Sequence, residues 1–323
     1  MPRGSSNSLL LAALLAVSLA GQAQTSAKVA RIGALGTAPS PAWEYFRQGL
    51  RDLGWIEGKN LIIEWRFTKG RGELHAEHAA EFARMKVDVI IAPLSLQVEA
   101  ARKATPTIPI VFCCHTDPVG HGHVASLTRP GGNITGVAQF TFDISTKRLE
   151  ILKKTLPNVV HVGVLRNPDY VEHGPVMAVL QEAGARLGLR LTTADARYPD
   201  EFESAYGALS SARADAVFVL LTPTTYVNRE KLAHLELKYR LPSAHTSRDH
   251  VRAGALMSFG VNTEDIMRRS ATFVDRILKG AKPGELPIEQ ATKYDFAINL
   301  RTAKALEIAI PQTALLSATE VIE

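Results

Sequence analysis

The sequence predicts an α/β protein with two similar, doubly wound parallel-sheet halves. Short β-branched runs alternate with amphipathic segments along most of the chain, which is typical of βαβ units. The run at residues 31–35 is echoed at residues 161–165, and each run is followed by a loop with proline and an amphipathic helix. The 323 residues also exceed what one hydrophobic core usually carries. Two unrelated βα domains would align about as well, so the repeat alone leaves that alternative open.

The first half begins with a strand at residues 30–35. The helix after it carries Phe46, Leu50 and Leu53 on one face, and Gly54 stands where a left-handed C-cap belongs. The remaining elements of this half are strands at 61–66, 87–92, 108–113 and 134–137 and helices at 74–84 and 95–104. One complete βα layer is therefore expected by residue 137.

The second half repeats this order. Its first helix ends at Gly188, as the earlier helix ends at Gly54, and residues 214–217 begin like the strand at 87–90. Later elements are a strand at 255–259, a long helix at 263–279 closed by Gly280, an apolar run at 294–299 and a short helix near 302–306. A long helix after two finished halves indicates that the chain crosses between the domains more than once. Several crossings make a hinge.

The N-terminus has the pattern of a secretory signal peptide over residues 1–23. Arg3 precedes an apolar run at residues 9–20 and a small-residue stretch at 21–23, which is the order of a cleavable signal. The apolar run is too short to span a bilayer, where about 20 residues are needed. A buried N-terminal helix is the alternative. No later segment reaches transmembrane length, so we expect a soluble mature protein in the periplasm.

Composition indicates an ordinary globular protein, with 46% hydrophobic and 21% charged residues. The formal net charge is +5, with Lys and Arg scattered among Asp and Glu, so no nucleic-acid partner is expected. The two cysteines, Cys113 and Cys114, are adjacent, which excludes a disulfide framework. A strained vicinal disulfide between them is a hypothesis for an oxidising compartment. Two alkylatable thiols in the mass spectrum of the unreduced protein would refute it.

Ligands of open parallel sheets bind where the strands end, because loops there lead into helix N-termini whose backbone N–H groups point outward. Polar and aromatic residues follow the expected strands, and the candidates for ligand binding are Thr37, Trp43, Ser95, Thr116, Asp117, Asn167, Thr222, Thr224, Phe259 and Asn262. Ser95 and Thr224 with neighbouring amides would hold a carboxylate, and Asp117 would pair with an ammonium. Trp43 or Phe259 would cover the apolar body of the ligand.

Each of these candidates also has a purely structural alternative. Ser95 is a good helix N-cap, and Asp117 before a proline is a common turn starter. Trp43 and Phe259 fit core positions equally well.

Signals for catalysis or a cofactor are weak. The chain has no Walker-type phosphate loop, no nucleophile elbow and no His-Glu-x-x-His helix. Residue types that bind metals gather at Cys113, Cys114, His115, His121 and His123, but their spacing differs from that of closed zinc sites. We therefore expect no cofactor and no enzyme activity. An exported enzyme that uses Cys113 and His115 is the alternative.

An ordered series of motifs covers nearly all of the mature chain, at residues 46–54, 57–60, 117–120, 129–136 and 299–306. Together they resemble the ABC-transporter substrate-binding family that includes tryptophan and tyrosine binders. The resemblance implies a type I periplasmic-binding-protein fold, with two domains joined by a three-crossing hinge and a ligand cleft between them. The lobes implied are residues 28–140 plus 261–284 and residues 141–260 plus 285–323.

The resemblance also implies a monomeric receptor that delivers a small organic ligand to an ABC permease in the inner membrane. A ligand-sensing partner of a membrane sensor would use the same cleft and is an alternative. The chain departs from the family at Cys113 and Cys114, where small apolar residues are usual, at Thr222-Pro223 in place of Asp-Pro, and at residues 259–262. Specificity would be decided there, so an aromatic amino acid or related carboxylate is only the leading expectation.

Overall fold

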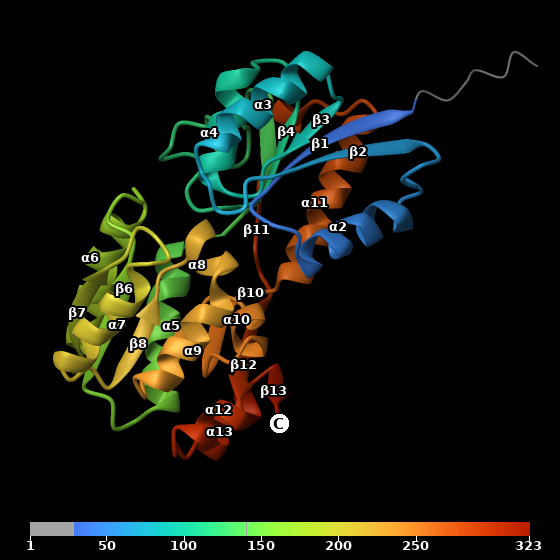
Figure 1. The fold of residues 1–323 in the computed structure, drawn as a ribbon. Coiled ribbons are helices and arrows are strands. Elements are labelled where there is room, and N and C mark those ends of the chain that lie inside the picture. The colour runs from blue at the N-terminus through green and yellow to red at the C-terminus, as the bar shows by residue number, and fades with distance from the viewer. Residues whose placement is uncertain (1–28, 140) are drawn as a thin grey trace, which may run out of the picture.

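The computed structural model describes residues 29–139 and 141–323, and these form two α/β lobes (Figure 1). The predicted signal peptide at residues 1–23 lies outside the described residues. Each lobe is built on its own sheet, as the sequence predicts. No helix among the described residues is both long enough and apolar enough to span a membrane.

The first lobe is a six-stranded sheet in the order β11-β5-β4-β3-β1-β2, in which all strand pairs are parallel. Its strands are β1 (Ala30–Gly36), β2 (Leu61–Phe67), β3 (Val89–Ile91), β4 (Ile110–His115), β5 (Ile134–Ala138) and β11 (Glu289–Gln290). Its helices are α2 (Pro41–Asp52), α3 (Leu74–Met85), α4 (Ser95–Ala104) and α11 (Thr263–Leu278), with the 3-10 turn η1 (Pro283–Glu285). Helix α11 comes late in the chain but packs against α2 (Figure 1).

The second lobe is a seven-stranded sheet in the order β13-β12-β10-β9-β8-β6-β7, parallel except for the β10–β12 pair. Its strands are β6 (His161–Arg166), β7 (Arg190–Asp195), β8 (Ala216–Val219), β9 (Ser243–His245), β10 (Met257–Val261), β12 (Tyr294–Asn299) and β13 (Glu320–Ile322). Its helices are α5 (Thr141–Thr155), α6 (His173–Arg186), α7 (Phe202–Ser211), α8 (Pro223–Val227), α9 (Arg229–Lys238), α10 (Arg248–Arg252), α12 (Leu300–Ala305) and α13 (Gln312–Ser317).

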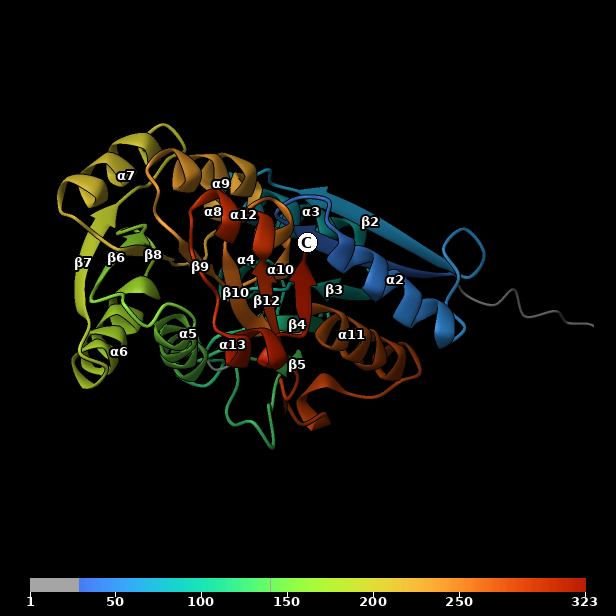
Figure 2. The ribbon, with the colours of Figure 1, turned by 90° about the horizontal axis from the view of Figure 1, so that it is seen from below.

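Helices cover both faces of each sheet (Figure 2). In the first lobe α2 and α11 share one apolar core with the sheet, and α3 and α4 share another on the opposite face. In the second lobe α5 and α6 bury one face of the sheet, and α7 and α9 bury the other. The predicted doubly wound architecture is therefore present in both lobes.

The two lobes share details of construction as well as strand order. The Asp88 carboxylate accepts the backbone N–H of Arg31 at 2.8 Å, and the Asp215 carboxylate accepts that of His161 at 2.8 Å. A Cβ at Gly33 would lie 2.6 Å from the Phe82 ring, so the central strand needs glycine where the covering helix crosses closely. In the second lobe, a Cβ at Gly163 would likewise lie 2.6 Å from the Leu209 side chain.

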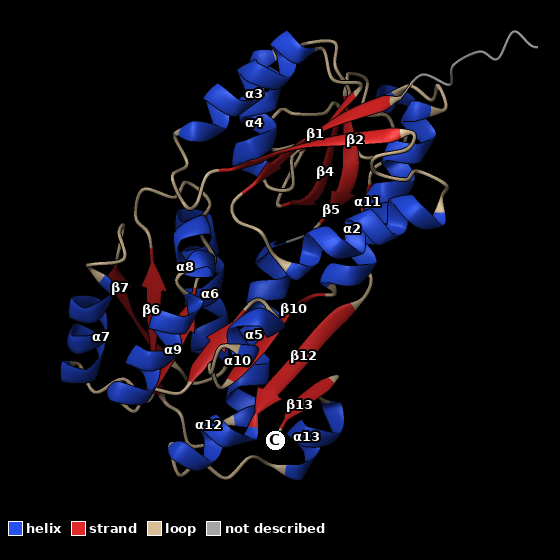
Figure 3. Ribbon diagram, turned by 45° about the vertical axis from the view of Figure 1, so that its right-hand side comes forward, coloured by secondary structure: helices blue, strands red, loops and turns tan. Residues whose placement is uncertain are grey.

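The chain crosses between the lobes after β5, after β10 and after β11 (Figure 3). The third crossing lies later than the boundary expected at residues 284/285, because Glu289 and Gln290 still pair with β5. Backbone hydrogen bonds tie the crossings together, from Ala291 N to Ala138 O and from Asn262 N to Lys293 O, both at 2.9 Å. The hinge thus consists of chain segments that are joined to one another by backbone hydrogen bonds.

One strand boundary differs from expectation in a way that affects the site. Strand β4 continues to His115, which pairs with Ala138 beyond a register shift. At this bulge Cys113 N and Cys114 N both donate to Pro93 O, at 3.3 and 2.8 Å. His115 therefore belongs to the strand, although its polarity indicates a loop.

Replacing Gly33 by Ala should destabilise the first lobe by about 1–3 kcal/mol, because the new methyl group overlaps the fully buried Phe82 ring. Urea unfolding would measure the change. Gly174→Ala on α6 is the matched control, since its Cβ meets nothing within 4 Å and we expect no loss. Equal stability of Gly33→Ala and the parent would refute the packing argument.

Candidate functional site

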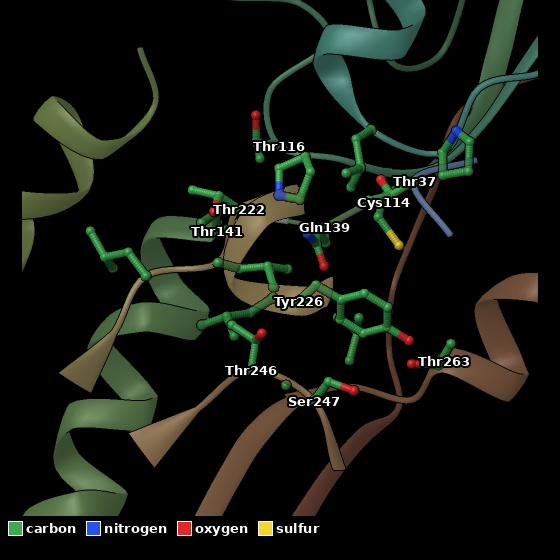
Figure 4. A pocket seen from close by; sticks show the side chains of 18 of the residues that line it. Thr37, Cys114, Thr116, Gln139, Thr141, Thr222, Tyr226, Thr246, Ser247 and Thr263 are labelled. Carbon is green, nitrogen blue, oxygen red and sulfur yellow. The ribbon is translucent and has the colours of Figure 1, made fainter. Parts of the chain in front are cut away.

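A cavity of about 240 Å³ lies between the two lobes. Its walls come from segments at or beyond the carboxyl ends of β1, β3, β4, β6, β8, β9 and β10 and from the first turns of the helices that follow. Figure 4 shows the Cys114 and Gln139 side chains directed into this space, with the Tyr226 ring facing them from α8. The cleft therefore lies at the strand ends where doubly wound sheets place ligands.

Four of the ten predicted site residues line this cavity, namely Thr37, Trp43, Thr116 and Thr222. Trp43 stands in the first turn of α2 and packs edge-on against Trp65, with ring centroids 5.1 Å apart. The Thr222 hydroxyl is already used as the N-cap of α8, where it accepts the Thr225 N–H at 3.0 Å. Ligand contacts of these four residues stay a prediction.

Ser95 and Asp117 do not line the cavity, contrary to expectation. The Ser95 hydroxyl is buried against His115 Nδ1 and Thr116 Oγ1, at 3.3 and 3.1 Å. The Asp117 carboxylate accepts the Gly120 N–H at 2.8 Å, so it closes a local turn.

Asn167 and Thr224 are likewise outside the cavity wall. The Asn167 side chain accepts the Asp169 N–H at 2.9 Å in a turn after β6. Thr224 lies on α8, where its carbonyl accepts the Asn228 side-chain amide at 2.9 Å. Ligand contacts of Asn167 and Thr224 also stay a prediction.

Phe259 and Asn262 belong to the hinge side of the second sheet and do not line the cavity either. The Phe259 ring on β10 stacks on Tyr294 of β12, with centroids 5.7 Å apart. Asn262 caps α11 by accepting the Asp265 N–H at 2.7 Å and donates to Asp295 at 2.8 Å. Both side chains are therefore committed to holding the second crossing in place.

Two histidines of the predicted cysteine and histidine cluster, His115 and His123, form a hydrogen-bonded chain with Glu99. Asp117 N–H donates to His115 Nδ1 at 3.2 Å, which leaves the proton of His115 on Nε2. His115 Nε2 then donates to His123 Nδ1 at 2.6 Å, and His123 Nε2 donates to Glu99 at 2.9 Å. The chain fixes the loop after β4, and no group of side chains suited to a metal ion occurs among the described residues.

Cys113 and Cys114 are free thiols in the structure. Cys113 lies in the apolar core beside α11, where burial raises its pKa to about 12. Cys114 lines the cavity, and burial raises its pKa as well. Two neutral thiols in these positions contribute packing, and neither has the lowered pKa of a reactive cysteine.

One of the cavity residues that the sequence did not single out is Arg148, in the middle of α5. Its side chain is 1% exposed, and its Nε and Nη1 atoms have no hydrogen-bond partner among the described residues. The guanidinium packs on the Phe218 ring at 4.1 Å, and burial alone lowers its pKa to about 9, so it stays charged at neutral pH. Ile144, Arg148 and Leu152 are four residues apart, which places them on one face of a helix. An arginine on this otherwise apolar face is the sequence signal that could have identified Arg148.

Two carboxylates, Glu172 and Asp249, also line the cavity. Asp249 accepts the Tyr226 hydroxyl at 2.7 Å, and a Glu172 carboxylate oxygen lies 3.9 Å from His121 Nε2 of the first lobe. The hydroxyls of Thr141 and Thr246 face the same cavity and are buried without hydrogen-bond partners among the described residues. Buried polar groups of this kind normally have partners, so the cavity is arranged to receive polar atoms of a ligand.

The family model of the ABC transporter substrate binding proteins matches residues 40–322. The chain belongs to this family. It is 25% identical to a tyrosine-binding protein of Clostridioides difficile over 264 residues, which is 81% of this chain and 75% of that protein.

Solved structures agree. A conserved domain protein from Vibrio cholerae is 30% identical, with a TM-score of 0.84 over 91% of this chain and 100% of its own. An ABC domain from Streptococcus pneumonia in complex with L-Trp is 23% identical, with a TM-score of 0.82 over 91% of this chain and 99% of its own. The fold is that of the type I periplasmic binding proteins.

Stability of this substrate-binding protein should fall as the pH drops from 7 to 5. Burial lowers the pKa of His75 to about 4, that of His115 to about 3 and that of His173 to about 4. The unfolded chain therefore takes up protons below pH 6.5 that the folded chain refuses until about pH 3–4, and folding is disfavoured in between. Each histidine should lower the free energy of unfolding by up to about 2 kcal/mol at pH 5.

Urea unfolding at several pH values would measure this loss. His115→Gln should reduce the pH dependence, and His234→Gln on the exposed face of α9 should leave it unchanged. A free energy of unfolding that stays constant between pH 7 and 5 would contradict the neutral, buried state of these histidines.

Proposed function

We propose that the protein is an exported receptor that binds a small organic carboxylate between its lobes and delivers it to an ABC permease of the inner membrane. The leading ligand class is an aromatic amino acid or a related acid. The receptor acts in the periplasm as a monomer and releases its ligand unchanged. The observation that carries this proposal is the buried guanidinium of Arg148 in the interlobe cavity, whose Nε and Nη1 atoms have no hydrogen-bond partner in the part of the chain that the structure describes.

A buried charge without a partner is costly, and proteins rarely keep one without a use. A guanidinium holds a carboxylate through two parallel hydrogen bonds, which makes a ligand carboxylate the natural partner of Arg148. The free hydroxyls of Thr141 and Thr246 are suited to the remaining oxygen lone pairs or to a ligand amino group. An ammonium group would find Glu172 or Asp249 on the same lobe.

The rest of the wall suits an apolar, flat body. Trp43 and Tyr226 line the cavity together with aliphatic residues of both lobes, including Leu94, Leu221 and Met267. A volume of about 240 Å³ is at the small end for ligand sites and fits a molecule of amino-acid size. The binding of tyrosine and of L-Trp by similar proteins supports the same class.

Arg148→Met should weaken ligand binding at least about 30-fold, because removing one member of a buried charge pair costs about 2–5 kcal/mol. The same variant, free of ligand, should be at least as stable as the parent, since it no longer buries an unpaired charge. Calorimetric titration with L-tyrosine, L-tryptophan and their 2-oxo acids, together with thermal unfolding, would measure both effects.

The matched control is Arg186→Met, whose side chain is 62% exposed and pairs with Glu182 on α6. It should change neither affinity nor stability appreciably. If wild type binds a carboxylate and Arg148→Met binds it equally well, Arg148 is not the anchor. If wild type binds no member of the panel and none raises its melting temperature, the proposed ligand class is wrong.

A further inference from the structure

The charged side chains that line the interlobe cavity are few. Among the described residues they are Arg148 on α5, Glu172 before α6 and Asp249 on α10, and Arg148 is the only cation. Every side chain labelled in Figure 4 is uncharged, and most of them are hydroxyls of threonine, serine or tyrosine. The charges of a ligand must therefore be matched by these three residues.

The immediate surroundings of Arg148 contain no negative charge. No carboxylate in the described ranges forms an ion pair with its guanidinium, and burial alone accounts for its lowered pKa. Burial, and to a smaller extent the charge of Arg148, lowers the pKa of the neighbouring His173 and His250. Both imidazoles are thus neutral at pH 7, and a ligand anion is the natural countercharge of Arg148.

The two carboxylates of the wall have different surroundings. One oxygen of Asp249 accepts the Tyr226 hydroxyl at 2.7 Å. The Glu172 side chain is 17% exposed and lies 3.9 Å from His121 Nε2 of the first lobe, whereas Arg148 is 1% exposed. Asp249 is also partly exposed. Both carboxylates reach solvent, which screens their charge, so neither needs a cation from the ligand.

The two charges of an α-amino acid are attached to the same carbon atom. If its carboxylate pairs with Arg148, its ammonium must lie beside the guanidinium, where a protein carboxylate would be needed to balance it. The other wall groups without hydrogen-bond partners in the described ranges are the hydroxyls of Thr141 and Thr246. A hydroxyl can donate to a neutral oxygen, but it cannot neutralise a buried ammonium.

Resting on the proposed function, we infer that the ligand is an aromatic monocarboxylate with an uncharged group, such as a carbonyl or hydroxyl oxygen, where an amino acid carries its ammonium. Its carboxylate pairs with Arg148, and its ring lies against the wall that contains Trp43 and Tyr226. The uncharged oxygen is suited to the threonine hydroxyls. This ligand class differs from the tyrosine and L-Trp bound by the similar proteins.

Calorimetric titration with ligands of one shape would test this inference. L-tyrosine and the para isomers of hydroxyphenylpyruvate and hydroxyphenylpropanoate differ only at the carbon next to the carboxylate. The two acids without an ammonium should bind at least about tenfold more tightly than L-tyrosine, because an ammonium buried without a carboxylate partner is unfavourable. The amide of hydroxyphenylpropanoate lacks the anion and should bind far more weakly than the acid.

Glu172→Gln and Asp249→Asn remove the two carboxylates of the wall and keep the shapes of the side chains. Neither should change the ratio of the affinities for hydroxyphenylpyruvate and L-tyrosine by more than about twofold, since neither acid is assigned a ligand charge. Glu182→Gln on α6, whose side chain is 72% exposed, is the matched control. Thermal unfolding of the free variants would check that they remain folded.

L-tyrosine that binds as tightly as the two acids, or more tightly, would overturn this inference and leave the proposed function intact. A selective loss of L-tyrosine binding in Glu172→Gln or Asp249→Asn would also overturn it, because it would reveal an ammonium site. Absence of binding by every member of the panel, or an amide that binds as well as the acid, would instead overturn the proposed function itself.

Discussion

The proposed site is organised around one buried charge, the Arg148 guanidinium. The second lobe buries it almost completely and stacks it on Phe218 of the sheet, and no carboxylate among the described residues forms an ion pair with it. Leu149 and Leu152 of the same helix are fully buried in the main core of that lobe. A scaffold of this size can retain one unfavourable charge where binding requires it.

The duplicated scaffold explains why this charge faces a cleft. Both sheets place their strand ends toward the same interlobe space, because each lobe follows the same order of strands around its central strand. The repeated aspartate contacts at Asp88 and Asp215 and the glycines at Gly33 and Gly163 hold the two central strands in equivalent surroundings. The hydrogen-bonded crossings then limit relative motion of the lobes to bending about the hinge.

Polar residues around the cavity divide into those that build the walls and those that remain available. The His115–His123–Glu99 chain, the Asp117 turn and the Thr222 cap satisfy their own hydrogen bonds and keep the loops in place. Arg148, Thr141 and Thr246 have side-chain atoms without a hydrogen-bond partner among residues 29–139 and 141–323. Pre-organised walls with a few unsatisfied groups favour binding, since the ligand need not order the site.

The sequence by itself determined the two-lobed fold, the order of most strands and the edge of the sheets where the cleft lies, because alternating periodicity and chain order fix which strand ends are adjacent. Short polar strands such as β9 (Ser243–His245) carry too little periodicity to be predicted. Only the tertiary structure decided which side chains line the cavity. The side chains of Asp117 and Asn167 accept backbone N–H groups of nearby residues, because local turns satisfy their oxygen atoms at small cost. Arg148 lines the cavity because the packing of α5 aims one position of its apolar stripe at the cleft, a direction that sequence spacing alone does not specify.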